Sequence, residues 1–339
     1  MFKPRFTYTH RIVNYIAKIA SARQAISDAK IIPVYADRLK QDALIKSSHY
    51  STSIEANPLK LDEVKTLIMD EKRATTKAEQ EVLNYFNTLN HLDIYADKGI
   101  TRKALLSLHG DLTKDLLRDP EYEGRFRDTD VIIGNIHARK INHIAPDAEE
   151  VSCLVDELLD WLNNGTAEMY PIIVAGILHY ELVRIHPFID GNGRTSRLMT
   201  NLVLSVSGFD VDGYLTLDEY YNQDRQSYVE ALNSADKSRD LTAWLEYFCQ
   251  AAAYSVDNVK REVLILAQKT LKYEHTTVLT ANEISVLTFL EENGHIRNRD
   301  VQKMLDISAQ ASYKILKKLM DINLIRSLGR GRSTEYELK

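Results

Sequence analysis

The chain has little glycine, proline or cysteine and no long apolar run. Only 13 of its 339 residues are glycine and 7 are proline, while 44% are hydrophobic, which favours a compact, helix-rich globular protein. Cys153 and Cys249 form neither a Cys-x-x-Cys pair nor a Cys/His pair at zinc spacing, so we interpret them as reduced thiols. The longest apolar run, around residues 170–178, is too short to span a membrane, and the N-terminus lacks the continuous apolar segment of a signal peptide. We therefore expect a soluble cytoplasmic protein.

The sequence also lacks the motifs of two common classes of enzyme site. The sequence has no Walker A lysine motif and no nucleophile elbow around a serine. Its net charge of −5 gives no reason to expect a polyanion-binding surface over the whole molecule. A chain of 339 residues is longer than one typical domain, so we expect two or three.

One segment gathers residues suited to phosphate chemistry, His186-Pro-Phe-Ile-Asp-Gly-Asn-Gly-Arg-Thr-Ser-Arg197. Arg194 and Arg197 stand three apart, so on a helix both project from one face. A Gly-Asn-Gly segment that opens a helix leaves backbone N–H groups free at the positive end of the helix dipole. Asp190 is placed to bind a divalent cation, and His186 to take a proton from an attacking hydroxyl. The segment predicts a site for a polyphosphate and a nucleophile.

Each of these residues also has an ordinary explanation when taken alone. A histidine before proline can cap a helix, Gly-Asn-Gly is a common loop, and two arginines on a helix usually form a solvated face. These explanations account poorly for the conjunction of all of them in twelve residues, so we favour the site.

The segment resembles the signature of the Fic family, H-x-F-x-[DE]-G-N-G-R-x-x-R, with every fixed position filled. Fic proteins mostly transfer AMP from ATP to a hydroxyl side chain of a target protein. The resemblance implies that His186 is the general base, that Asp190 holds Mg²⁺ on the α- and β-phosphates, and that Arg194 and Arg197 grip the β- and γ-phosphates. The nucleotide-binding residues that it implies are Asp190, Gly191, Asn192, Gly193, Arg194, Thr195, Ser196 and Arg197. Asn192 and the amides of Gly191 and Gly193 would hold phosphate oxygens.

A second segment, Ser51–Asn57, resembles the inhibitory helix of Fic proteins, [ST]-x-x-x-E-[GN]. Ser51 and Glu55 match this pattern, whereas Ala56 occupies the Gly/Asn position. A carboxylate beside Arg197 would form a charge-assisted pair where the γ-phosphate belongs and leave ATP misaligned. The alternative is a helix-end glutamate exposed to water. We favour the inhibitory role because the segment precedes the motif by more than a hundred residues, as in N-terminally inhibited Fic proteins.

The segment between Gly124 and Pro146 lacks helical spacing and predicts a short β-hairpin. Its strands are expected at 131–133 and from Ile136 onward, with the turn at Gly134-Asn135. It resembles the flap over the Fic active site, in which case Ile133, Gly134 and Asn135 face the nucleotide or the target. A plain surface hairpin is the alternative. Tyr228 and Asp236 are similarly implied to line the adenine pocket.

The expected fold is mainly α, a Fic-type helical core with a short β-hairpin flap plus a small C-terminal winged helix-turn-helix. Helical spacing covers about 1–30, 33–54, 61–69, 76–96, 101–115, 147–163, 168–185, 193–207 and 217–270. We predict three parts. They are an N-terminal helical region (1–100, with the inhibitory helix at about 33–57), the Fic core (101–270, with the flap at 131–140), and a winged helix (281–339).

The winged helix is expected from helices at 281–292, 298–305 and 308–320, followed by two strands within 324–338. This part carries 10 Lys/Arg and 8 Asp/Glu, a balance of +2, which is weaker than a specific DNA reader usually carries. The basic residues that could contact phosphates are Lys314, Lys317, Lys318, Arg330 and Arg332. Protein contact or dimerisation is the alternative use of this part.

The leading functional hypothesis is a Mg²⁺-dependent protein adenylyltransferase with ATP as substrate, autoinhibited by Glu55. The expected partners are a target protein with a Ser, Thr or Tyr hydroxyl docked on the flap, DNA or a protein at the winged helix, and a second copy of the chain, with no membrane. Two alternatives remain within the enzyme class: transfer of another nucleotide, and removal of AMP with Glu55 aligning a water. A third hypothesis is a DNA-binding regulator that senses nucleotide through its Fic core.

Overall fold

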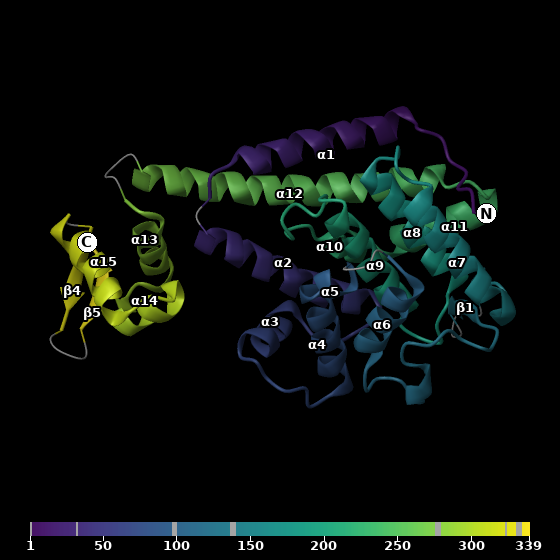
Figure 1. Cartoon of the computed structure of the whole chain (residues 1–339), viewed down its shortest axis with the longest axis horizontal. Helices are drawn as coiled ribbons and strands as arrows, with labels where there is room; N and C mark the ends of the chain where they lie inside the picture. Colours follow the sequence, from purple (N-terminus) through teal and green to yellow (C-terminus); the bar gives the residue numbers. More distant parts are fainter. Residues whose placement is uncertain are drawn as a thin grey trace. The chain divides into compact units, whose positions relative to one another are not determined.

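Helices make up most of the protein in the computed structural model (Figure 1), which describes residues 2–31, 33–96, 100–135, 140–274, 279–322, 324–329 and 334–339. These residues form two compact units. The first consists of Met1–Ile26 and Leu39–Lys260, and the second of Ser27–Arg38 and Arg261–Lys339.

The first part of the chain is built from helices and one hairpin. The elements up to Glu274 are α1 (His10–Asp28), α2 (Pro33–Ile54), α3 (Leu61–Met69), α4 (Lys77–Asn90), α5 (Asp93–Ala96), α6 (Arg102–Thr113), the 3₁₀ turn η1 (Pro120–Tyr122), β1 (Ile132–Asn135), β2 (Lys140–Ile144), α7 (Ala148–Asn164), α8 (Pro171–Ile185), α9 (Asn192–Val206), α10 (Leu217–Gln223), α11 (Arg225–Ser238) and α12 (Thr242–Glu274).

Helix α8 lies at the centre of the first unit. Its sequence is almost entirely apolar, and Pro171 at its first position has the backbone angle that a helix start requires. A helix that is hydrophobic on all sides is stable only when it is covered on all sides. Accordingly α8 packs along α9 and against α7, while α4 and α6 cover α9. The loop between α8 and α9 is therefore held by two buried helices.

Helix α12 approaches α8 closely at Gly176. The indole Nε1 of Trp244 donates a hydrogen bond to the carbonyl of Gly176 over 2.7 Å. A Cβ atom at this position would lie 2.9 Å from side-chain atoms of Leu245 and Phe248, closer than real Cβ contacts come. The absence of a side chain at Gly176 lets the two helices meet.

The hairpin expected near the flap is present. Strands β1 and β2 pair antiparallel, with Ile132 opposite Ile144 and an irregularity between Ile133 and Gly134. Both Ile132 and Ile144 are exposed. The loop of the hairpin, residues 136–139, lies outside the described residues.

The second unit contains α13 (Ala281–Asn293), β3 (Ile296–Arg297), α14 (Asn298–Leu305), α15 (Ala309–Asp321), β4 (Ile325–Leu328) and β5 (Glu335–Leu338). The strands form an antiparallel sheet in the order β3-β5-β4, which gives a winged helix-turn-helix. Its apolar core is formed by Val286, Leu287, Leu290, Ile296, Val301, Leu316, Leu319, Ile325 and Tyr336. The start of α2 belongs to this unit, because Tyr35 packs on Ile284 and bonds Thr288.

The expected mainly helical class is confirmed, with local differences. Helices at 33–54 and 61–69 lie as predicted. The predicted helix at 1–30 begins only at His10, and the block at 217–270 consists of three helices. The two-residue strand β3 was not predicted, since so short a segment carries no alternation of apolar and polar residues. Within the described residues, no helix is long and apolar enough to cross a membrane.

Replacing Gly176 by alanine tests the approach of α8 and α12. We expect a loss of about 1–3 kcal/mol in the free energy of unfolding, because the added methyl must displace Leu245 and Phe248. Urea denaturation measures this loss. Gly110→Ala in α6 is the matched control, because its Cβ meets only ordinary contacts of 3.6 Å or more and alanine favours the helix. Equal stability of the two variants would contradict the close approach.

Candidate active site

The loop between α8 and α9 is closed by its own asparagine. The Asn192 side chain accepts a hydrogen bond from the backbone N–H of Phe188 over 2.9 Å and donates one to the Phe188 carbonyl over 2.8 Å. Helix α9 begins at Asn192, one residue earlier than predicted, and Gly191 precedes it with a φ of 79°. The first turn of α9 thus points its backbone N–H groups at the loop, as phosphate binding at a helix N-terminus requires.

His186 caps α8 in a left-handed conformation, with φ 52° and ψ 58°. Its Nδ1 lies 3.2 Å from the carbonyl of Val183, which can only accept, so Nδ1 carries the proton and Nε2 is the basic atom. Burial lowers the pKa of His186 to about 4, and the nearby His143 and Arg127 act in the same direction. The imidazole is therefore neutral near pH 7, as a general base must be.

Arg127 holds the His186 backbone in this conformation. The Arg127 side chain has no exposed surface, and its Nε donates to the His186 carbonyl over 2.8 Å. Its backbone N–H donates to the Pro187 carbonyl over 2.9 Å. The sequence reasoning missed Arg127, because the residue lies 59 positions before His186 and in no recognisable motif.

His109 forms a hydrogen bond with the backbone of Asp190. Its Nδ1 accepts a hydrogen bond from the Gly124 N–H over 3.0 Å, so Nε2 carries the proton and donates to the Asp190 carbonyl over 3.0 Å. The His109 ring stacks on Phe188 with the centroids 3.6 Å apart. Burial lowers the pKa of His109 to about 4, which keeps it neutral. His109 was also not predicted, since a histidine on an amphipathic helix carries no signal of its role.

Asp190 and Arg194 form one side of the site. The Asp190 Oδ1 accepts from the Gly191 N–H over 2.5 Å and lies 3.2 Å from Nη2 of Arg194. The Asp190 side chain is 58% exposed, whereas that of Arg194 is 7% exposed. Arg194 also pairs with Glu81. The buried Nε of Arg194 has no hydrogen-bond partner among the described residues, which suits an anionic ligand that would supply one.

Arg197 is enclosed by the end of α2. Its Nη2 lies 2.9 Å from Oε1 of Glu55 and 2.9 Å from the Ser51 carbonyl, and its Nε donates to the Ser51 hydroxyl over 2.6 Å. Asp218 lies 3.3 Å from Nε on another side. Burial would raise the pKa of Glu55, but the Arg197 guanidinium outweighs it and holds that pKa below its usual range. Glu55 is thus an ionised partner of Arg197, as the inhibitory role requires.

The fit of Glu55 depends on its neighbours. A Cβ atom at Gly193 would overlap Oε1 of Glu55, so only glycine leaves room for the carboxylate beside the first turn of α9. Ala56 has a φ of 70°, the left-handed conformation that glycine or asparagine adopts more readily. The departure from the family pattern at Ala56 therefore leaves the helix-end geometry intact, at a cost in backbone strain.

Comparison with known proteins agrees with this geometry. Residues 99–204 match the Fic/DOC family, and residues 279–326 match a family described as winged helix-turn-helix DNA-binding. Residues 99–204 are therefore similar to a Fic domain. A solved Fic family protein from Desulfovibrio desulfuricans G20 aligns over 100% of this chain and 98% of its own, with a TM-score of 0.69 and 27% identity.

The chain is also similar in sequence to proteins named protein adenylyltransferase Fic. The protein adenylyltransferase Fic of Culex quinquefasciatus is 27% identical over 65% of this chain and 43% of its own length. That of Nematostella vectensis is 27% identical over 72% of this chain and 54% of its own length. The chain thus spans about half the length of these relatives.

Several predicted site residues are buried or bonded within the first unit. Thr195 and Ser196 are 1% exposed, and the Ser196 hydroxyl donates to the Asn192 carbonyl. Tyr228 is 4% exposed and its hydroxyl lies 2.8 Å from Nε2 of His179. Asp236 accepts from the Tyr180 hydroxyl and pairs with His143 of β2 over 2.8 Å. The adenine-pocket role of Tyr228 and Asp236 stays a prediction.

The flap residues occupy β1. Ile133 belongs to the strand, as predicted. The predicted turn at Gly134-Asn135 is wrong, because both residues belong to β1 and pair with β2. The side chains of all three residues lie outside the described residues. His143 ties β2 to α11 through Asp236, and this hydrogen bond raises the pKa of His143. The flap hairpin is thereby joined to α11 of the first unit.

A metal would depend on Asp190. In the part of the chain that the structure describes, no group of three or more His, Cys, Asp or Glu residues could hold a metal ion. Mg²⁺ commonly uses one or two carboxylates together with substrate phosphates and water. The exposed Asp190 carboxylate at the edge of the phosphate site suits a metal bound in that way.

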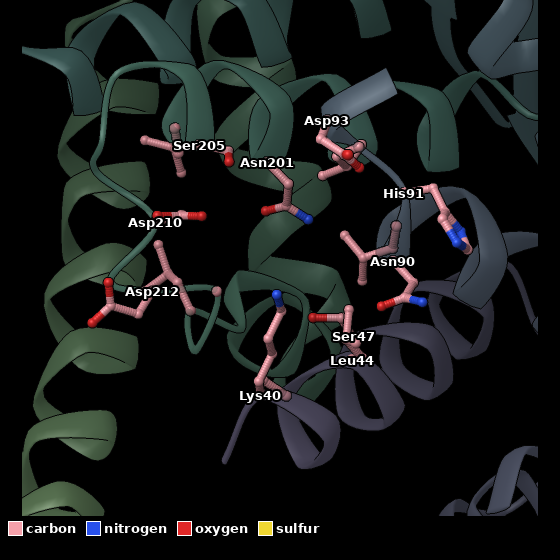
Figure 2. A pocket seen from close by; sticks show the side chains of 16 residues that line it. Lys40, Leu44, Ser47, Asn90, His91, Asp93, Asn201, Ser205, Asp210 and Asp212 are labelled. Carbon is pink, nitrogen blue, oxygen red and sulfur yellow. The ribbon is translucent and has the colours of Figure 1, made fainter. Parts of the chain in front are cut away.

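A separate cavity of about 730 Å³ lies between α2 and α9. Lys40, Asn201 and Asp210 point into it (Figure 2). None of the residues that line it belongs to the motif at 186–197. The cavity is therefore distinct from the phosphate site.

The state of His186 can be measured directly. We expect its imidazole to titrate near pH 4 rather than near 6.5, because burial opposes its positive charge. As the pH falls from 6.5 toward 4, the unfolded chain takes up this proton first, so the folded protein loses stability in that window. NMR titration of the histidine ring signals, assigned with His186→Ala, checks the value. A pKa at or above 6.5 would contradict the buried, neutral base.

Proposed function

We propose that the chain is a Mg²⁺-dependent protein adenylyltransferase that moves AMP from ATP to a Ser, Thr or Tyr hydroxyl of a target protein, and that Glu55 inhibits it. The observation that carries the proposal is a neutral His186 beside two buried arginines at one helix N-terminus. The curated relatives named protein adenylyltransferase Fic support the same activity.

The residues of the site have two roles in this reaction, proton transfer and the positioning of the phosphates. Nε2 of His186 takes the proton of the target hydroxyl as its oxygen bonds to the α-phosphorus of ATP. The bond from that phosphorus to the β-phosphate bridging oxygen breaks, and pyrophosphate leaves. Mg²⁺ held by Asp190 and the phosphates would neutralise charge on the leaving group. Arg194, Arg197 and the N–H groups of the first turn of α9 orient the phosphates, which is most of what such a transfer needs.

Inhibition follows from the contacts of Arg197. In the structure its guanidinium is bound to Glu55 and Ser51, so its Nη2 is already paired where the γ-phosphate would bind. A nucleotide that enters beside Glu55 meets a negative charge there and lies out of line for attack on its α-phosphate. Adenylyl transfer then requires Glu55 to leave Arg197.

The flap is the proposed docking surface for the target. An exposed strand can pair with an extended segment through backbone hydrogen bonds, which would register a hydroxyl beside His186. The link from His143 of β2 to Asp236 supports this, because it holds the strand next to α11. Backbone pairing recognises an extended segment of many sequences, so the hydroxyl and not its neighbours defines the substrate class.

A second candidate function is DNA contact by the winged helix. It rests on the family match of residues 279–326 and on the exposed Lys314 and Lys317 of α15. Lys318 pairs with the buried Glu283 over 2.8 Å, so it contributes to the fold of this unit. Arg330 and Arg332 lie outside the described residues. Labelling with radioactive ATP tests the transferase, whereas a mobility shift of duplex DNA without label would favour the regulator.

Replacing Glu55 by glycine tests the inhibition. We expect automodification with labelled ATP and Mg²⁺ to rise by about 10²-fold, because the Arg197 guanidinium becomes available to the γ-phosphate. Adding Arg197→Ala to Glu55→Gly should return the rate to a low level, since the phosphate then lacks its partner. Activity no higher than in the wild type would remove the inhibitory role. A fall would favour AMP removal with Glu55 aligning a water.

Replacing His186 by alanine separates the base from the phosphate site. We expect transfer to fall by roughly 10²–10⁴-fold in the Glu55→Gly background, because the target hydroxyl loses its proton acceptor. ATP affinity, measured by calorimetry, should stay within about twofold, because His186 contacts the hydroxyl rather than the phosphates. An equal loss of ATP affinity would exclude the assigned role.

A further inference from the structure

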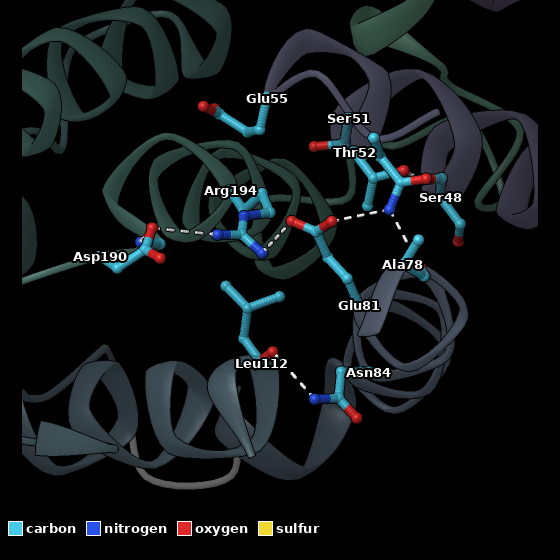
Figure 3. A network of polar contacts seen from close by, with 12 residues as sticks. Ser48, Ser51, Thr52, Glu55, Ala78, Glu81, Asn84, Leu112, Asp190 and Arg194 are labelled. Atoms are coloured by element: carbon cyan, nitrogen blue, oxygen red, sulfur yellow. Dashed lines mark hydrogen bonds and ion pairs between the residues drawn. The ribbon is translucent and has the colours of Figure 1, made fainter. Parts of the chain in front are cut away.

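Arg194 is held by a carboxylate from outside the motif. Figure 3 shows its guanidinium between Asp190 on one side and Glu81 of α4 on the other. Nη1 pairs with Oε1 of Glu81, and Nη2 lies 3.2 Å from Asp190. Because each terminal nitrogen contacts a carboxylate, the planar guanidinium is held in one orientation. Its Nε remains buried without a partner among the described residues.

The pair between Glu81 and Arg194 is shielded from water. The Glu81 side chain is 17% exposed and that of Arg194 is 7% exposed. An arginine does not lose its proton in a protein, so its buried charge needs a counter-charge in fixed geometry. Asp190 alone cannot fix it, because that carboxylate is 58% exposed and is the predicted metal ligand.

Glu81 is in turn held by Asn57, the last residue of the inhibitory segment Ser51–Asn57. The side-chain amide of Asn57 donates to Oε2 of Glu81 over 2.7 Å and to the Ala78 carbonyl over 3.0 Å. The backbone N–H of Asn57 donates to the Thr52 carbonyl in the last turn of α2. An unbroken line of contacts therefore joins the end of α2 to Arg194.

We propose that Glu81 and Asn57 are positioning residues for ATP, which hold Arg194 in the orientation that grips the phosphates. This rests on the proposed function. The end of α2 then has two opposite effects, since Glu55 blocks Arg197 while Asn57, two residues later, supports Arg194. Activation consequently requires the Glu55 side chain to turn away while the end of α2 stays in place.

The test uses the full-length Glu55→Gly protein, with Mg²⁺, to which Glu81→Gln or Asn57→Ala is added. We expect ATP affinity, measured by calorimetry, to fall about tenfold in each, because Arg194 loses its orientation. AMP affinity should not change, since AMP lacks the phosphates that Arg194 grips. In automodification kinetics the KM for ATP should rise by a similar factor with kcat nearly constant.

Further variants separate positioning from folding. Glu230→Gln and Asn87→Ala, both at exposed helix positions, are the matched controls and should change neither affinity. The double variant Glu81→Gln, Asn57→Ala should bind ATP as weakly as Glu81→Gln alone, because Asn57 acts through Glu81. Should Glu81→Gln not fold, Asn57→Ala carries the test, because it keeps both charges of the ion pair and removes only the hydrogen bond that orients Glu81.

The outcomes are distinct. Unchanged ATP affinity in both variants, or an equal loss of ATP and AMP affinity, would overturn the proposal. A selective loss of ATP affinity in a Glu55→Gly protein that transfers no AMP would support the positioning role and refute the proposed function.

Discussion

The buried charge of Arg197 is the constraint on which the site depends. The side chain is 2% exposed, so it is stable only with counter-charges and acceptors around it. Glu55, Ser51 and Asp218 supply them in the structure. Burial raises the pKa of Asp218 to about 6, although Arg197 opposes this shift. A γ-phosphate would supply negative charge at the same place as Glu55, and the proposed inhibition rests on this equivalence.

The same principle extends to the whole phosphate site. Two arginines lie among four carboxylates, Glu55, Asp218, Glu81 and Asp190. A polyphosphate entering this arrangement would meet net negative charge unless a carboxylate moves or a cation accompanies it. A bound cation and the movement of Glu55 out of the site would each reduce this net negative charge. Glu81, fixed by Asn57, remains as the permanent partner of Arg194.

The loop is held by two neutral side chains and one buried arginine. His109 and Asn192 bond its backbone, and Arg127 binds the carbonyl of the left-handed His186. Burial lowers the pKa of both His109 and His186, so neither adds a charge near pH 7. His186 is therefore held in its left-handed conformation by hydrogen bonds to the loop backbone.

The sequence by itself determined the elements and the motif. The apolar periodicity of α8, the glycines before α9 and the spacing of Arg194 and Arg197 are local patterns, and so they predicted helices, loop and phosphate site. The pairing of Glu55 with Arg197 was predicted only through a resemblance, since 142 residues separate them. Arg127, His109, Glu81 and Asp218 were not predicted at all. Glu81, His109 and Asp218 lie in α4, α6 and α10, and Arg127 lies in the segment between η1 and β1. Only the tertiary structure brings side chains so distant in sequence within hydrogen-bonding distance of the motif.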